Sequence, residues 1–68
     1  MATHLMDLKC GGRTYYISHS GDTVYYSVES RGRGSTTIRG LKFRGNQIIN
    51  TDNNKPASDF EICHKMGK

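Results

Sequence analysis

Two adjacent glycines, Gly11 and Gly12, separate two segments in which apolar and polar residues alternate. Every second residue from Met6 to Cys10 is apolar, the pattern of a β-strand with one buried face. Glycine readily adopts the positive φ that a two-residue hairpin turn requires. With that turn, Leu8 pairs with Tyr15 and the apolar faces of the two strands coincide. The sequence therefore predicts an antiparallel hairpin.

A second turn is predicted at residues 19–22, His-Ser-Gly-Asp. It pairs Ile17 with Val24 and Tyr16 with Tyr25, which makes the two tyrosines direct neighbours on the outer face. Both hairpins give one consistent apolar face, and a slip of one residue would move every side chain to the other side. We therefore expect a three-stranded meander. Its inner face contains Met6, Leu8, Tyr15, Ile17, Val24, Tyr26 and Val28.

The alternation breaks once in the strand predicted for residues 36–44. Ile38 and Leu41 have opposite parity, although both are strongly apolar. A bulge at Arg39 and Gly40 restores the phase, because a bulge adds one residue to one strand and glycine is common there. The inner face of this strand then includes both apolar residues.

Gly45 and Asn46 form a third short turn signal, which leads to a strand at residues 47–50. This turn pairs Phe43 with Ile48 on the inner face. The remaining segments of this half, residues 30–35 and 51–56, are polar and are expected as loops.

The C-terminal segment fits two patterns. Ser58 and Glu61 have the spacing of a helix capping box, and Gly67 follows as a stop signal. Residues 59–66 also alternate as a strand would. We favour a short helix that closes one end of the sheet, with a strand as the alternative.

The chain has 68 residues and 7.6 kDa, which is enough for one domain covering residues 1–68. We expect a mainly β fold, a small antiparallel meander or barrel of four to five strands with a short C-terminal helix. Only 34 % of the residues are apolar, so no segment is expected to span a membrane. Residues 1–10 lack the basic start and long apolar run of a secretory signal, and we therefore expect a cytoplasmic location.

Charge is the most informative feature for function. The formal net charge is +4, and the excess of cations lies in residues 30–51, which contain no Asp or Glu. Guanidinium groups suit bidentate contact with phosphate, and glycines let backbone amides approach an anion. The candidate binding residues of this basic segment are Arg31, Arg33, Arg39, Lys42 and Arg44. The opposing interpretation is a solvated surface that keeps a small protein soluble.

Tyr16 and Tyr25 are the other candidate binding residues. An exposed tyrosine can stack on a nucleobase, and tyrosine and arginine are enriched in protein-binding hot spots. A cross-strand aromatic pair also stabilises a sheet without any ligand, and this structural role is the alternative.

Cysteines and histidines could in principle bind a metal, but their spacing matches no zinc motif. We expect no metal and no cofactor. A disulfide between Cys10 and Cys63 needs an oxidising compartment, so we expect two reduced thiols, with Cys10 packed at the end of a strand. No phosphate-loop or dinucleotide motif is present.

These features predict a non-enzymatic module that binds single-stranded or structured nucleic acid. The alternative is a small inhibitor or regulator that occludes a larger protein with an acidic surface. A small ribonuclease using His19 is a third hypothesis, although residues 18–22 are too close in the chain to form a triad. A homodimer formed by pairing of strand edges is also possible.

Overall fold

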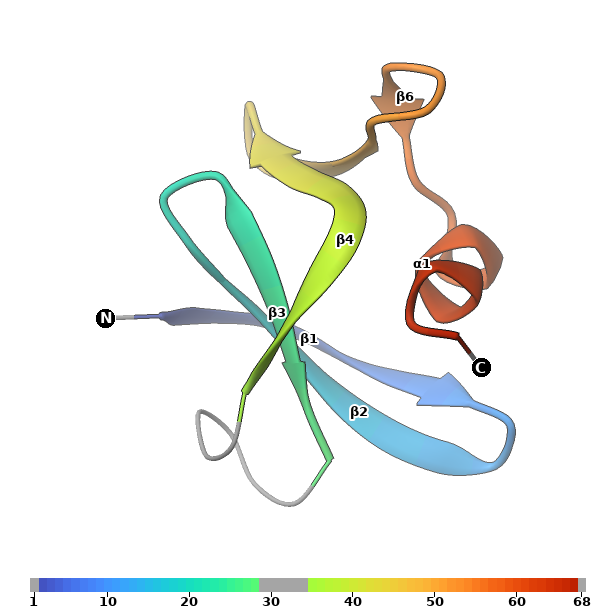
Figure 1. Cartoon of the computed structure of the whole chain (residues 1–68). Coiled ribbons are helices and arrows are strands. Elements are labelled where there is room, and N and C mark those ends of the chain that lie inside the picture. The colour runs from blue at the N-terminus through green and yellow to red at the C-terminus, as the bar shows by residue number, and fades with distance from the viewer. Residues whose placement is uncertain (1, 29–34, 68) are drawn as a thin grey trace.

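The computed structural model describes residues 2–28 and 35–67. Six antiparallel strands form one sheet in chain order, and a short helix follows them (Figure 1). The elements are β1 (Thr3–Cys10), β2 (Arg13–Ser20), β3 (Thr23–Ser27), β4 (Thr36–Arg44), β5 (Gln47–Asn50), β6 (Lys55–Pro56) and α1 (Asp59–Lys65). The sheet curls into a half-barrel, and α1 lies on its open side (Figure 1). The expected mainly β fold with a C-terminal helix is confirmed.

The sixth strand comes from a segment that we expected to be a loop. The amide of Asn54 donates to the carbonyl of Asn50 (2.8 Å), and Asn54 has a φ of 56°. This tight turn brings Lys55 and Pro56 back beside β5, where Pro56 pairs with Ile49. Asparagine tolerates this left-handed conformation better than most residues, which is why a polar segment forms a short strand pair.

The first hairpin has the predicted register. Gly11 and Gly12 both have positive φ (60° and 84°), and Cys10 pairs with Arg13 across the turn. Leu8 lies opposite Tyr15 as expected. The register shifts only near the start of β1, between His4 and Met6.

The predicted register of the second hairpin is wrong by two residues. Gly21 and Asp22 alone form the turn, so Ser20 pairs with Thr23. Tyr16 therefore lies opposite Ser27 instead of Tyr25. Because side chains alternate with a period of two, a shift of two residues keeps each residue on its face. The apolar pattern could not distinguish these two registers.

The predicted bulge in β4 is present. Thr37 pairs with Tyr25, whereas Lys42 pairs with Thr23, so β4 contains extra residues between these pairs. Gly40 lies in this interval with a φ of 87°, a conformation that side-chain-bearing residues adopt at a cost. Ile38 is consequently buried together with Leu41, as expected.

The core lies between the concave face of the sheet and α1. Gly45 and Asn46, both with positive φ, form the turn that pairs Phe43 with Ile48. The buried apolar residues are Leu8, Cys10, Tyr15, Ile17, Val24, Ile38, Leu41, Ile48, Ile62 and Met66. Val28 is an exception to the expected inner face, because β3 ends at Ser27 and Val28 is 40 % exposed.

The predicted capping box begins α1. The Ser58 hydroxyl accepts from the amide of Glu61 (3.3 Å), and a Glu61 carboxylate oxygen accepts from the amide of Ser58 (2.9 Å). Gly67, with a φ of 82°, ends the helix by donating its amide to the carbonyl of His64 (3.0 Å). Ile62 and Met66 point into the core. No helix in residues 2–28 and 35–67 has the length and apolar character needed to cross a membrane.

The expectation of two reduced thiols is contradicted. Cys10 and Cys63 form a disulfide with an S–S distance of 2.05 Å and a Cα–Cα distance of 5.7 Å. Cys10 ends β1 on the inner face, and α1 docks against that end of the strand. The sequence pattern predicted the strand that ends at Cys10 and favoured the helix that carries Cys63, but not where the helix docks, so it did not bring the two sulfurs together.

Candidate binding surface on strand β4

The described cations of the basic segment lie on the outer face of β4. Arg39, Lys42 and Arg44 are all exposed, and the inward positions between them are apolar. Arg39 precedes the bulge at Gly40, and the bulge returns Lys42 and Arg44 to the same face. Strand β4 therefore presents three cations to solvent along its length. Arg31 and Arg33 lie outside the described residues.

The residues paired with these cations across the sheet are uncharged. Lys42 lies between Thr23 and Ile49, and Arg44 lies opposite Gln47. Within residues 2–28 and 35–67, neither side chain forms a salt bridge or a hydrogen bond. The positive charge of β4 is therefore not neutralised by its neighbours in the sheet.

Several carboxylates of the protein are held elsewhere. Asp7 accepts a hydrogen bond from the Nε2 of His4 (2.7 Å) at the β1 edge. Asp52 forms an ion pair with Lys65 at the end of α1. Glu61 is held by the capping box, and the backbone hydrogen bond from Ser58 lowers the pKa of its carboxyl below the ordinary value of 4.5. In the β2–β3 turn, the backbone carbonyl of Asp22 accepts from the amide of Phe43 of β4 (2.8 Å).

Tyr16 and Tyr25 share the outer face but are not direct neighbours. Tyr25 pairs with Thr37 of β4, so it lies one strand away from the cations. Tyr16 lies one strand further away and faces Asp7 on β1. Both rings are half-buried. The structure therefore brings Tyr25, but not Tyr16, next to the basic strand.

The side chain of His19 makes contacts that stabilise the fold. Its ring stacks on Phe43 with a centroid distance of 3.8 Å and an interplanar angle of 21°. Its Nδ1 donates to the carbonyl of Gly21 (2.9 Å). These contacts fix the β2–β3 turn against β4. In the described ranges, no group of three or more His, Cys, Asp or Glu side chains is arranged to hold a metal ion.

A second surface feature, which the sequence did not reveal, lies beside α1. A cavity of about 390 Å³ lies between the helix and the β1–β2 turn. Phe60 forms part of its wall although 79 % of the residue is exposed, and its ring stacks on His64 at 6.5 Å and 15°. The spacing of Phe60 and His64 is i, i+4, which places both on one helix face. This spacing could have predicted the pairing of the two rings from the sequence, but only on the assumption that residues 59–66 form a helix.

Comparisons with known proteins add no further constraint. No family model, curated protein or solved structure is significantly similar to this chain.

Proposed function

We propose that this protein is a non-enzymatic module that binds nucleic acid through the outer face of β4. One observation carries the proposal. Arg39, Lys42 and Arg44 are exposed on one strand and have no ion-pair partner within the described residues, and the residues paired with Lys42 and Arg44 are uncharged. Unneutralised cations on a rigid sheet attract phosphate, because binding releases the counterions of the nucleic acid.

The proposed roles of the β4 residues follow from their positions. Arg39, Lys42 and Arg44 contact phosphates along the strand. For Arg31 and Arg33, which lie outside the described residues, phosphate contact is proposed from the sequence alone. Tyr25 stacks on an unpaired base beside this track, since it pairs directly with β4. Single-stranded or structured nucleic acid is the expected ligand because its bases are available for stacking.

A test of the stacking role compares Tyr25→Ala with Tyr16→Ala. A base–aromatic stack contributes about 1–3 kcal/mol per base, so loss of Tyr25 weakens binding of a single-stranded oligonucleotide by about tenfold or more. Loss of Tyr16 changes affinity little, because that ring faces Asp7. Equal losses in the two variants contradict the assignment.

The second candidate is a protein-binding inhibitor or regulator that occludes a partner with an acidic surface. The exposed Phe60 ring beside the cavity of about 390 Å³ favours it, because exposed aromatic side chains often anchor protein interfaces. The same cations on β4 then contact carboxylates of the partner instead of phosphates.

The compartment is part of this proposal. A cytoplasmic location stays a prediction, and the Cys10–Cys63 disulfide weighs against it. Disulfides persist in oxidising environments and are rare in the cytosol. The test is to fractionate the source cells and to separate the oxidised and reduced forms of the protein in each fraction. Reduced protein in the cytosolic fraction supports a cytoplasmic location, and oxidised protein in a non-cytosolic fraction contradicts it.

The decisive experiment for nucleic-acid binding is a fluorescence anisotropy titration with a labelled single-stranded oligonucleotide. The variant Lys42→Gln/Arg44→Gln is compared with the control Arg13→Gln/Lys55→Gln, which removes the same charge from exposed positions outside β4. Loss of two phosphate contacts weakens binding about 20-fold at 0.1 M salt. Equal weakening in both variants shows that net charge alone acts, and rules out β4 as the site.

A pull-down from lysate distinguishes nucleic acid from a protein partner. A bound species that disappears after nuclease treatment supports nucleic acid. A protein that remains bound after treatment, and is lost with Lys42→Gln/Arg44→Gln, supports the inhibitor.

A further inference from the structure

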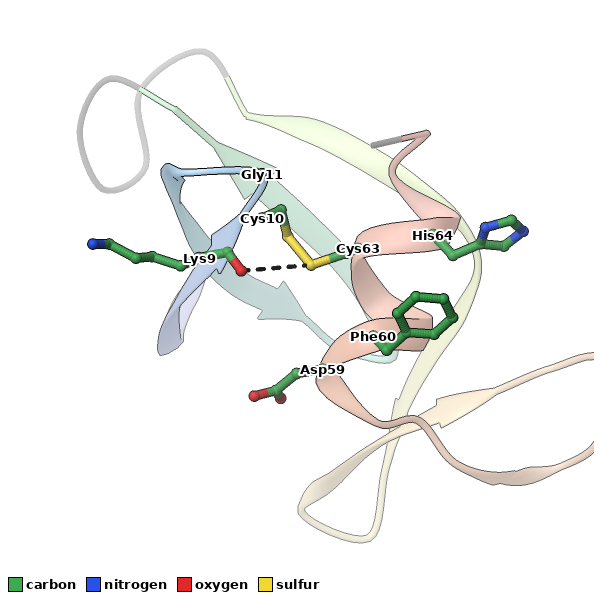
Figure 2. Close-up of a pocket in the computed structure, with 7 residues that line it drawn as sticks. All are labelled: Lys9, Cys10, Gly11, Asp59, Phe60, Cys63 and His64. Atoms are coloured by element: carbon green, nitrogen blue, oxygen red, sulfur yellow. Dashed lines mark hydrogen bonds between the residues drawn. A yellow bond between two sulfur atoms is a disulfide. The ribbon is translucent and has the colours of Figure 1, made fainter.

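The disulfide forms part of the wall of a surface cavity. The cavity has a volume of about 390 Å³ and lies between α1 and the β1–β2 turn (Figure 2). Its lining residues are Lys9, Cys10, Gly11, Asp59, Phe60, Cys63 and His64. A disulfide buried in the core would be shielded by side chains, whereas this disulfide borders an open space large enough for a small thiol.

The two cysteines differ in exposure. Cys10 is 5 % exposed and packs with the core residues at the end of β1. Cys63 is half-buried on α1, and its Sγ lies 3.8 Å from the carbonyl oxygen of Lys9 at the cavity wall (dashed line in Figure 2). A reagent entering from solvent therefore has better access to the sulfur of Cys63.

The β1–β2 turn and α1 form the two sides of the cavity. The carbonyl oxygen of Lys9 faces Cys63, whereas the exposed Lys9 side chain extends away from the disulfide, and His64 lies on the helix (Figure 2). Gly11 contributes no side chain, and a Cβ at this position would meet no atom within 4 Å. The positive charge of Lys9 therefore acts by attracting an anionic thiol toward the β1–β2 turn, and Gly11 places no side chain on this side of the cavity.

From these observations we infer that the cavity is a site of thiol–disulfide exchange, at which a small-molecule thiol reduces the Cys10–Cys63 disulfide in the folded protein. The thiolate attacks Sγ of Cys63. The S–S bond breaks, and Cys10 leaves as a thiolate that takes a proton from water. A second thiol molecule then attacks the mixed disulfide, releasing Cys63 and a disulfide of the small thiol. Two electrons pass from the two thiols to the two cysteines.

Exchange at this site changes how α1 is held. The helix has seven residues, and an isolated helix of that length is marginal in water. After reduction, α1 is held by burial of Ile62 and Met66, by the hydrogen bond from Asn50 to Glu61 (3.3 Å) and by the ion pair between Lys65 and Asp52. Exchange therefore converts a covalently fixed helix into one held by non-covalent contacts.

The test uses the intact oxidised protein with glutathione as the thiol. The reduction rate is measured by mass spectrometry after acid quenching, at urea concentrations below the unfolding transition. Reduction of the folded protein gives a rate that changes less than about twofold per molar urea. Reduction that requires global unfolding accelerates roughly fivefold per molar, because the unfolded population rises with denaturant. That steep dependence would overturn the proposal.

The quenched samples also locate the site of attack. Fragmentation of the mixed-disulfide intermediate is expected to find glutathione on Cys63. Glutathione on Cys10 would contradict the assignment even if the rate is independent of urea.

A matched pair of charge variants tests the role of the rim. Glutathione carries a net negative charge, so Lys9→Glu is expected to slow its reaction about threefold or more at low salt. Lys55→Glu makes the same change of net charge on β6, away from the cavity, and serves as the control. Equal rates for the two variants would show that Lys9 does not guide the thiol, and would contradict the proposed approach through the cavity.

Discussion

At the scale of single residues, Gly40 is the position at which strand β4 packs against Lys65 at the end of α1. A Cβ built on Gly40 would lie 3.0 Å from the Nζ and Cδ atoms of Lys65, whose ammonium forms an ion pair with Asp52. The carbonyl of Gly40 also accepts from the amide of Thr51 (3.0 Å). The bulge therefore favours glycine for its φ of 87°, and a Cβ at this position would require the flexible end of the Lys65 side chain to move by a few tenths of an ångström.

This contact predicts that Gly40→Ala destabilises the protein more than Gly21→Ala. Both glycines have positive φ, and alanine there costs about 1–2 kcal/mol; only Gly40 has a neighbour within 4 Å. Urea unfolding of both variants measures the difference. Removing the contact with Lys65→Ala should reduce the cost of Gly40→Ala, and an unchanged cost would show that the backbone strain alone matters.

The capping box predicts a dependence of stability on pH. The hydrogen bond from the amide of Ser58 lowers the pKa of Glu61 below 4.5 in the folded protein. Its ionised form therefore stabilises the fold fully above pH 4.5, and this contribution is lost as the pH falls through the lowered pKa. Glu61→Gln keeps the box geometry without the charge.

The free energy of unfolding of the wild type and Glu61→Gln, measured by urea between pH 7 and pH 3, tests this expectation. The advantage of the wild type should shrink below pH 4.5. An advantage that stays constant or grows toward low pH would contradict the role of the ionised carboxylate.

At the scale of elements, the turns at Gly11–Gly12 and Gly45–Asn46 and the helix start were predictable because each depends on local sequence. The glycine pair at residues 11 and 12 fixes the first hairpin, and Ser58 with Glu61 fixes the start of α1. The register of β2 with β3 was not predictable, since a shift of two residues keeps the faces unchanged. The docking of α1 against β1 depends on distant residues, so the disulfide was missed.

The disulfide is expected to be a major stabilising contact between elements. It joins residues 53 apart in the sequence, and closing a loop of that length in the unfolded chain corresponds to about 4 kcal/mol. Cys10→Ala/Cys63→Ala should therefore lower the free energy of unfolding by about 2–5 kcal/mol in urea titrations. A loss below about 1 kcal/mol would show that packing of Ile62 and Met66 alone holds the helix.

At the scale of the whole molecule, the apolar core and the exposed cations of β4 lie on opposite faces of the sheet. The concave face and α1 bury the apolar side chains, while β4 presents Arg39, Lys42 and Arg44 on the outside. The sequence predicted this strand and its bulge, because the alternation of apolar residues and the position of Gly40 defined the faces. It did not predict the cavity beside α1, which depends on how the helix docks.

The salt dependence of binding to single-stranded nucleic acid tests the central claim most directly. Each neutralised phosphate contributes a slope of about −0.7 to log affinity against log salt. Contacts from Arg39, Lys42 and Arg44 alone give a slope of about −2, and contacts from Arg31 and Arg33 make it steeper. In the variant Lys42→Gln/Arg44→Gln the slope should become shallower by about 1.4. Affinity that does not change with salt, or a slope that is identical in the variant, would contradict binding of phosphates by strand β4.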